Sequence, residues 1–219
     1  MIGDLHCHTK LSDGSLGIED IIVQAKRTGI DFISITDHDT MSSVSRAKVL
    51  GERYGVQVLP GVELSAWDKS RNRKVHILCY APRKPDRLEG VCMKACEIRK
   101  ACAREMVENV MKLYPITVES VLKYATGSKS IFKQHIMHAL IDYGYTTEFY
   151  GELNDELFNL KSGTCIVERE YPDVNFVLDL IHSARGVAVM AHPVYYDSLE
   201  LLEELAAKGK IDGVEAYRE

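Results

Sequence analysis

Short apolar runs alternate along the chain with longer segments whose apolar residues recur at helical spacing. Runs rich in Val and Ile are typical of strands, and their alternation with helix-length segments is typical of a parallel α/β sheet. We therefore predict an α/β fold with a mostly parallel sheet. Its six strands are expected at residues 2–5, 32–35, 57–61, 75–79, 187–191 and 213–216.

Amphipathic segments between these runs predict helices with recognisable ends. In residues 18–28 the apolar positions follow a helical spacing, and Gly29 stands where a left-handed residue commonly ends a helix. Asp and Ser are favoured at the start of a helix because their oxygens accept from free backbone N–H groups. The same reasoning predicts helices at 44–54, ending at Gly55, at 174–185, capped by Asp173, and at 199–208, capped by Ser198.

The alternation stops in the middle of the chain, between residues 82 and 163. This stretch predicts a long helix at 88–113, a stop at Pro115, and shorter helices at 117–124 and 131–143. We interpret it as a helical insertion. The predicted parts are a first barrel part at 1–81, the insertion at 82–163 and a second barrel part at 164–219.

Composition narrows the class of protein. The 219 residues are 46% hydrophobic and 27% charged, which is typical of a soluble globular chain. No apolar run approaches the roughly 20 residues that cross a bilayer, and no signal peptide is visible, so we expect a cytoplasmic protein without a membrane partner. A net charge of −5 argues against a general nucleic-acid coat. The six cysteines form no C-x-x-C pair and are expected to be free thiols.

Histidines and acids cluster at the predicted strand ends. Because the carboxyl ends of parallel strands converge on one face, residues far apart in the sequence should meet there. Histidine nitrogens and carboxylates are ligands of zinc, manganese and iron. The residues in question are His6 and His8 after the first strand, Asp37 and His38 after the second, Glu63 after the third, His76 in the fourth and His192 after the fifth.

The spacing of His6 and His8 supports a metal site. In an extended segment alternate side chains point the same way, so both imidazoles can reach one ion. A site with several metal ions lowers the pKa of bound water and stabilises charge on phosphate oxygens. Phosphate ester hydrolysis is therefore the leading prediction, and amide or amidine hydrolysis by the same metals remains open.

Five motifs in order resemble those of a known family. DLHCHTKLSDG at 4–14, ITDHDT at 35–40, GVELS at 61–65, KVHILCYAP at 74–82 and MAHPV at 190–194 resemble the successive motifs of the polymerase and histidinol phosphatase (PHP) superfamily. The spacing is most similar to the branch that contains nucleoside 3',5'-bisphosphate phosphatases and the 5'-3' exoribonuclease RNase AM.

The resemblance implies a distorted barrel of seven strand–helix units with two to three divalent metal ions, of manganese, zinc or iron. It implies catalytic roles for Asp13, His38 and Glu63. Asp37 is expected to orient a ligand or its loop. In the implied metal site His6 and His8 bind one ion, Glu63 bridges it to a second ion held also by His76 and His192, and Asp13 with His38 holds a third.

The resemblance also points to phosphate contacts in the insertion. IFKQHIMHAL at 131–140 stands where this branch has an Arg-Pro-His run, and Lys133 and His135 are the matching residues expected to contact substrate phosphate. Lysine supplies charge without the planar fork of arginine. Arg99 and Arg104 are expected to lie on a solvated helix face.

The end of the sequence departs from the branch pattern. Members close the barrel with a strand ending in Asp-x-His, but no Asp-x-His follows His192 before the final GVEAYRE. We therefore expect a barrel lacking its C-terminal strand–helix unit, with the ion at Asp13 and His38 bound most weakly. Unpaired strand edges are generally avoided, so a homodimer covering them is expected.

These observations predict a metal-dependent phosphoesterase acting on a small phosphorylated substrate, either a nucleotide or the 5' end of a short oligonucleotide. Two alternatives stay open. One is a phosphatase of the histidinol-phosphate type on the same scaffold. The other is a catalytically silent metal-binding domain, which the missing Asp-x-His favours.

Overall fold

The computed structural model describes residues 1–216 and divides the chain into two compact units. The first unit comprises Met1–Ala95 and Glu170–Glu219, and the second comprises Cys96–Arg169. The predicted boundaries of the insertion, 82 and 163, differ from these, because α3 (Glu89–Leu113) begins in the first unit and continues into the second. The last three residues of GVEAYRE, at 217–219, lie outside the described residues.

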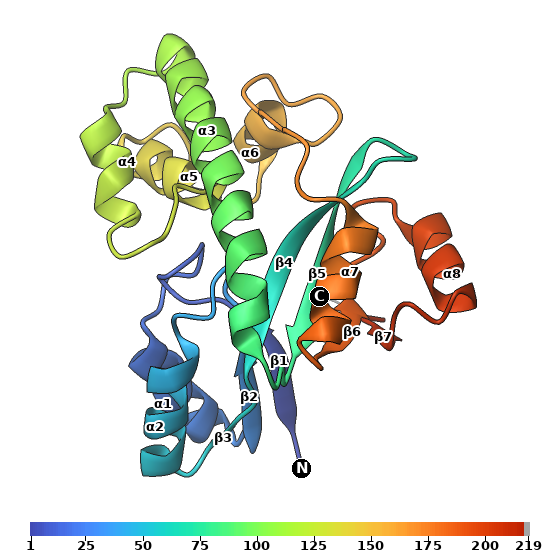
Figure 1. Ribbon diagram of the computed structural model, residues 1–219. Helices are drawn as coiled ribbons and strands as arrows, with labels where there is room; N and C mark the ends of the chain where they lie inside the picture. Colours follow the sequence, from blue (N-terminus) through green and yellow to red (C-terminus); the bar gives the residue numbers. More distant parts are fainter. Residues whose placement is uncertain (217–219) are drawn as a thin grey trace. The chain divides into compact units, whose positions relative to one another are not determined.

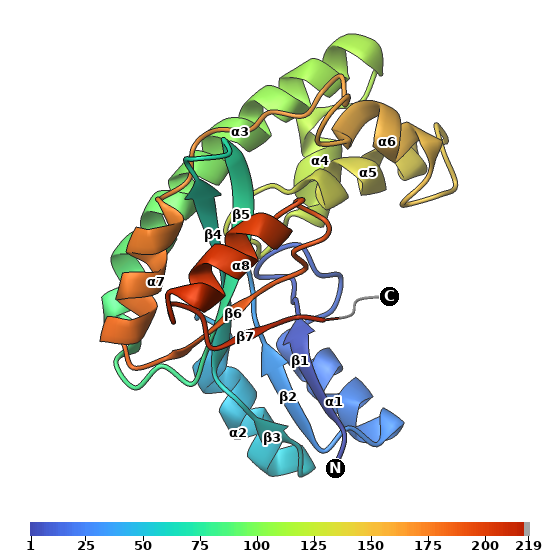
Figure 2. The ribbon, with the colours of Figure 1, turned by 90° about the vertical axis from the view of Figure 1, so that its right-hand side faces the viewer.

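The N-terminal part of the first unit is a parallel sheet, as predicted. Strands β1 (Gly3–Cys7), β2 (Phe32–Ile35) and β3 (Gln57–Val58) pair in that order. Helices α1 (Ile18–Thr28) and α2 (Val44–Tyr54) share a buried apolar cluster with β2 (Figure 2). Both helices end at a glycine in the left-handed region, Gly29 at φ 77° and Gly55 at φ 70°, which confirms the predicted ends.

The second sheet of this unit corrects the prediction of a mostly parallel sheet. Strands β4 (Gly61–Asp68), β5 (Arg73–Tyr80), β6 (Val187–Met190) and β7 (Gly213–Val214) lie in sequence order (Figure 1). The β4–β5 and β5–β6 pairs are antiparallel, and only β6–β7 is parallel. Strand β4 was not predicted. The prediction extended one strand over residues 57–61, whereas two strands occupy this stretch, separated by Leu59 and Pro60.

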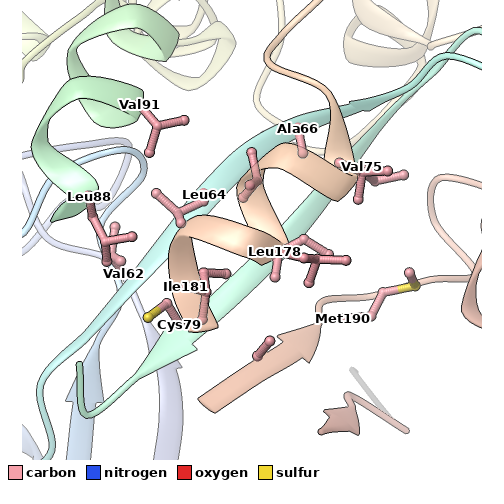
Figure 3. Packing of buried hydrophobic residues seen from close by; sticks show 14 of the residues in the cluster. Val62, Leu64, Ala66, Val75, Cys79, Leu88, Val91, Leu178, Ile181 and Met190 are labelled. Carbon is pink, nitrogen blue, oxygen red and sulfur yellow. The ribbon is translucent and has the colours of Figure 1, made fainter. Parts of the chain in front are cut away.

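Strand β4 is buried along its whole length, and apolar and polar residues alternate along it. Val62, Leu64 and Ala66 are fully buried in the main apolar cluster, and Glu63 and Ser65 alternate with them. In a strand, successive side chains point to opposite faces, so the polar pair faces away from that cluster. Figure 3 shows Val62, Leu64 and Ala66 packed with residues of α3, α7 (Val174–Ser183) and β5.

The caps of the last two helices were predicted with unequal success. Asp173 accepts from the backbone N–H groups of Asn175 and Phe176, which confirms it as the cap of α7. The prediction for Ser198 is wrong, because its hydroxyl donates to the carbonyl of Tyr196 and makes no capping bond to α8 (Leu199–Ala207). Within residues 1–216 all six cysteines are thiols and none forms a disulfide, as predicted.

The second unit is helical. It contains most of α3 together with α4 (Val118–Tyr124), α5 (Lys133–Asp142) and α6 (Glu152–Phe158), around a buried apolar cluster that includes Val110, Ile136 and Leu140. Helix α6 and the short 3-10 helix η1 (Pro85–Leu88), which lies in the first unit, were not predicted. Within residues 1–216 no helix is both long and apolar enough to cross a membrane.

Candidate metal centre

Both sheets of the first unit contribute to one cluster of histidines and acids. His6 lies in β1, His8 and Asp13 lie in the loop after it, and His38 follows β2. The second sheet supplies Glu63 from β4, His76 from β5 and His192 just after β6. His6 and Glu63 therefore lie within strands, and the prediction that each follows a strand is wrong. An isolated parallel bridge between His38 and Glu63 brings the two sheets together.

Glu63 lies at the middle of the cluster. The residue is 1% exposed, and five imidazoles face its two carboxylate oxygens. Oε2 lies 2.9 Å from His6 Nε2, 3.1 Å from His8 Nε2 and 3.4 Å from His38 Nδ1. Oε1 lies 2.7 Å from His76 Nδ1 and 2.8 Å from His192 Nε2.

Two sets of three residues have a geometry that could hold an ion. One set is His6, Glu63 and His192, and the other is His8, His38 and Glu63; in each, the ligand atoms lie within 4.8 Å of one another. Glu63 is common to both, as the family resemblance implies for a bridging carboxylate. The grouping of histidines differs from the implied one, because His6 is set with His192 and His8 with His38.

Asp13 lies beside the second of these sets. Its Oδ1 is 3.6 Å from His8 Nδ1 and its Oδ2 is 3.7 Å from His38 Nε2. Its side chain is 12% exposed, against 1% for that of Glu63. The structure thus brings together all seven side chains predicted as metal ligands: His6, His8, Asp13, His38, Glu63, His76 and His192.

The loop that carries Asp13 is held by the buried carboxylate of Asp37. The backbone N–H of Thr9 donates to Asp37 Oδ1 at 2.7 Å, and the Thr9 hydroxyl donates to Oδ2 at 2.8 Å. The Ser12 hydroxyl donates to Oδ1 at 2.8 Å. Asp37 therefore orients the loop between His8 and Asp13, one of the two roles expected for it.

Asp39 is a second buried acid in this region, and no role was predicted for it from the sequence. It adopts φ 54° and accepts from the backbone N–H of Ser65 at 2.8 Å and from the Ser65 hydroxyl at 2.9 Å. Since Asp39 follows β2 and Ser65 lies in β4, this pair of bonds fixes one sheet against the other beside Glu63. Aspartate tolerates the left-handed region better than most residues do.

The pKa values of the cluster reflect burial and mutual charge. Burial alone would raise the pKa of Glu63, but the charge of His38 and hydrogen bonds from His192 and His6 outweigh it and hold the pKa well below its usual range. Glu63 is therefore an anion, and a buried anion requires nearby positive charge.

The histidines differ from one another. Burial would lower the pKa of His6, but hydrogen bonds to Glu215 and Glu63 outweigh it and raise that pKa to about 9. The pKa of His8 is also raised, because Asp13 and Glu63 outweigh burial. Burial dominates at His76 and holds its pKa well below the usual range. Without metal, the first sheet thus carries protonated imidazoles and His76 of the second sheet is neutral.

The donor set fits divalent metal ions. Imidazole nitrogens and carboxylate oxygens are the ligands that zinc, manganese and iron share. The buried atoms His76 Nε2 and His192 Nδ1 have no hydrogen-bond partner within residues 1–216, which is unusual for polar atoms in a protein interior. A cation held between Glu63 and the imidazole nitrogens that face it would provide the positive charge that the buried carboxylate requires.

The predicted phosphate contacts belong to the second unit, and their role stays a prediction. Lys133 is the first residue of α5, and His135 is 3% exposed with its Nδ1 accepting the backbone N–H of Phe132. Arg104 is exposed as expected. The expectation for Arg99 is wrong, because its guanidinium is buried 4.6 Å from the ring centre of Phe132.

One acid in contact with the cluster was missed. Glu215 follows β7, and its Oε1 lies 3.0 Å from His6 Nδ1. Neither a motif nor the spacing of residues 213–216 marks Glu215 in the sequence, since the short apolar run there predicts only a strand.

Comparisons with known proteins identify the family of this chain. The chain is 36% identical, over 99% of its length and 83% of the relative, to the phosphoribosyl 1,2-cyclic phosphate 1,2-diphosphodiesterase of Eggerthella lenta. It is 30% identical to the 5'-3' exoribonuclease Rnm of Salmonella typhimurium, over 94% of this chain and 71% of that one. A crystal structure from Bifidobacterium adolescentis, described as that of a metal-dependent phosphoesterase, superposes with a TM-score of 0.87 at 27% identity, covering 98% of this chain and 77% of that one. The PHP domain family model matches residues 4–207, and the chain belongs to this family.

Proposed function

We propose that this protein is a metal-dependent phosphoesterase that hydrolyses a phosphate ester carried by a ribose unit. The observation that carries the proposal is the buried Glu63 carboxylate with five imidazoles at 2.7 to 3.4 Å. Such a set has few uses other than holding cations, and the PHP family to which the chain belongs contains phosphoesterases.

Two ions, or three, would be held by the chain's own residues. His6, Glu63 and His192 would hold one ion, and His8, Glu63 and His38 a second. Asp13 and His76 adjoin these sets and would complete them or contribute to a third. Divalent ions bound here would lower the pKa of a water molecule and neutralise charge on the phosphate oxygens. Manganese, zinc and iron all suit these ligands.

Asp13 and His38 suit proton transfer at the edge of the centre. Their side chains are 12% and 10% exposed and their closest atoms are 3.7 Å apart, so the pair can exchange a proton with substrate oxygens or water. Glu63, which is almost fully buried, would instead keep its charge and hold the two ligand sets together. These are the catalytic roles that we assign to the three residues.

The substrate class rests on the relatives. The named substrates of the two relatives above share a phosphorylated ribose, in one case a cyclic phosphodiester and in the other RNA. We propose the same chemistry here, with Lys133 and His135 as phosphate contacts on the strength of the family resemblance. A distorted barrel of the PHP type is a further proposal that rests on the same resemblance. A homodimer is a proposal that rests on the general avoidance of unpaired strand edges.

An assay of the purified chain tests this function. Phosphate ester hydrolysis should be measured with manganese, zinc or iron on a ribose 1,2-cyclic phosphate, a nucleoside 3',5'-bisphosphate, a 5'-phosphorylated oligoribonucleotide and histidinol phosphate. We expect turnover of at least one ribose ester, abolished by a chelator and in His8→Ala. Turnover of histidinol phosphate alone would overturn the substrate class, and no turnover above His8→Ala would support a silent metal-binding domain.

A further inference from the structure

Glu215 makes two contacts that converge on one of the candidate metal sites. Its Oε1 lies 3.0 Å from Nδ1 of His6, and its Oε2 accepts the backbone N–H of His192 at 2.8 Å. The side chain is only 18% exposed. His6 and His192 are two of the three members of the set completed by Glu63.

The contact to His6 selects one form of its ring. A carboxylate only accepts hydrogen bonds, so Glu215 favours the proton on His6 Nδ1. In a neutral imidazole the lone pair then lies on Nε2, which is the nitrogen 2.9 Å from Glu63 Oε2. A metal ligand needs its lone pair on the side that faces the ion. Glu215 therefore presents His6 in the form and orientation that a metal ion requires.

The contact to His192 fixes its backbone. His192 adopts φ 29°, outside the region that most side chains prefer, so other interactions must hold it there. The bond from its N–H to Glu215 is one such interaction. Glu215 is itself held in register, because its backbone N–H donates to the carbonyl of Met190 in β6 at 2.9 Å. The end of β7 is thus tied to the strand that precedes His192.

We propose that Glu215 is a positioning residue for the metal ion at His6, Glu63 and His192: it holds the His6 ring by Nδ1 and the His192 backbone by N–H. The inference rests on the proposed metal-dependent function. It adds a residue outside the predicted ligand set and concerns the binding of one ion rather than the reaction.

The chain offers a matched control close to Glu215. Asp212 lies three residues earlier and accepts the backbone N–H of Ala188 at 2.8 Å, so it makes the same kind of bond to β6. The described contacts of Asp212 include no imidazole of the cluster. Asp212→Asn therefore reports the cost of weakening a carboxylate–backbone bond at this edge, and Glu215→Gln adds the loss of a contact to the metal centre.

Metal binding to the whole chain is the first readout. Calorimetric titration with zinc or manganese should show one ion bound about 10 to 100 times more weakly in Glu215→Gln, the usual effect of losing such an outer partner. Glutamine has a single acceptor oxygen and so retains at most one of the two bonds. Asp212→Asn should bind all ions as the wild type does. Equal affinities in Glu215→Gln and the wild type would overturn the proposal.

The His6 ring gives a second readout that needs neither activity nor a stable variant. Nitrogen-15 spectra of the metal-loaded wild type should show the His6 proton on Nδ1 and its lone pair on Nε2. The opposite tautomer would overturn the proposal even if Glu215→Gln failed to fold. A wild type that binds metal with this tautomer but hydrolyses no phosphate ester would overturn the proposed function and leave the role of Glu215 intact.

Discussion

The two sheets of the first unit contribute to the candidate metal centre in different ways. The parallel sheet β1–β3 supplies His6, His8, Asp13 and His38, most of them from loops just beyond strand ends. The second sheet supplies Glu63 and His76 from within paired strands, where the register sets Ser65 opposite His76. One side is thus fixed by loop hydrogen bonds, above all to Asp37, and the other by strand pairing.

This difference teaches where each half is vulnerable. A loop held by a few hydrogen bonds to one buried carboxylate depends on that carboxylate, because each donor left without a partner costs free energy. A residue within a strand is held by the ladder on both sides and by the apolar face beneath it. Substitutions should therefore destabilise the residues of the two sheets to different extents, except at residues that contact both sheets.

The largest effect is expected at Glu63, because its carboxylate faces histidines from both sheets. Glu63→Gln removes the charge that five imidazoles face, so we expect loss of both candidate ions and a fall in kcat/KM on the order of 10³-fold or more. Metal content of the purified protein and phosphate release measure the two effects.

The exposed Glu203 provides the control for this change. Glu203→Gln removes the same charge from α8 and should leave metal content and rate unchanged. Retention of both ions by Glu63→Gln would contradict a central role for this carboxylate in joining the two halves.

Substitution of Asp37 should affect the residues supplied by the parallel sheet β1–β3 more than those supplied by β4–β7. Asp37→Asn replaces an acceptor of three donors from Thr9 and Ser12, so the metal-free protein should lose about 2 to 3 kcal/mol of unfolding free energy. The ion at His8 and His38 should weaken more than the ion at His6 and His192. Urea denaturation and metal titration check these expectations.

Asp31 gives a comparison for that measurement. Its carboxylate accepts the backbone N–H of Ile2 at 2.7 Å but its side chain is 55% exposed, so Asp31→Asn should cost well under 1 kcal/mol. Similar losses of unfolding free energy in both variants would show that burial of the Asp37 hydrogen bonds does not add to stability.

The pH dependence of the unfolding free energy should come from histidines of the parallel sheet β1–β3. The pKa of His6 is raised from 6.5 to about 9 in the folded metal-free protein, so its stabilising contribution is full below pH 6.5 and is lost as pH rises to about 9. The metal-free protein should therefore lose on the order of 2 kcal/mol of unfolding free energy across this range. Urea denaturation at several pH values measures it.

In His6→Gln the side chain does not titrate, so this slope should become smaller, and the part due to His8, whose pKa is also raised, should remain. His76 should add none of it, because its lowered pKa keeps it neutral throughout this range. Metal binding requires deprotonated imidazoles, so proton release on metal binding at pH 7 should also fall in His6→Gln. An unchanged slope in that variant would place the titrating group elsewhere.

The smallest expected effect concerns a single bond between the sheets. The Tyr80 hydroxyl of β5 donates to the carbonyl of Leu5 in β1 at 2.8 Å. Tyr80→Phe should cost about 1 kcal/mol of unfolding free energy and leave metal content unchanged. The exposed Tyr150, at 71%, offers Tyr150→Phe as a control with no expected loss, and equal losses would assign no role to the bond.

The sequence predicted the parallel sheet β1–β3 and its helices better than the mixed sheet β4–β7. Residues 18–28 and 44–54 end at Gly29 and Gly55, and these local signals held because helix ends depend on neighbours in the chain. The alternation of Val62, Leu64 and Ala66 is present in the sequence, but the predicted strand ended at residue 61.

Gly61 has a different reason, visible only in three dimensions. A Cβ at Gly61 would lie 2.3 Å from Ser34 Oγ and 2.8 Å from Thr36 Cγ2, so glycine allows β4 to approach β2 closely. This approach lets the bridge between His38 and Glu63 form. Gly61, which the prediction placed at the end of a strand, is thus a point of close contact between the two sheets.

The sequence by itself determined which side chains are candidate metal ligands and the order of the motifs that carry them, because residue chemistry and strand alternation are local properties. Only the tertiary structure decided how they are grouped around Glu63, that Asp39 joins the sheets, and that Glu215 reaches His6 across 209 positions of sequence. Those contacts arise from strand pairing and sheet approach, which bring distant residues together irrespective of any pattern near them in the chain.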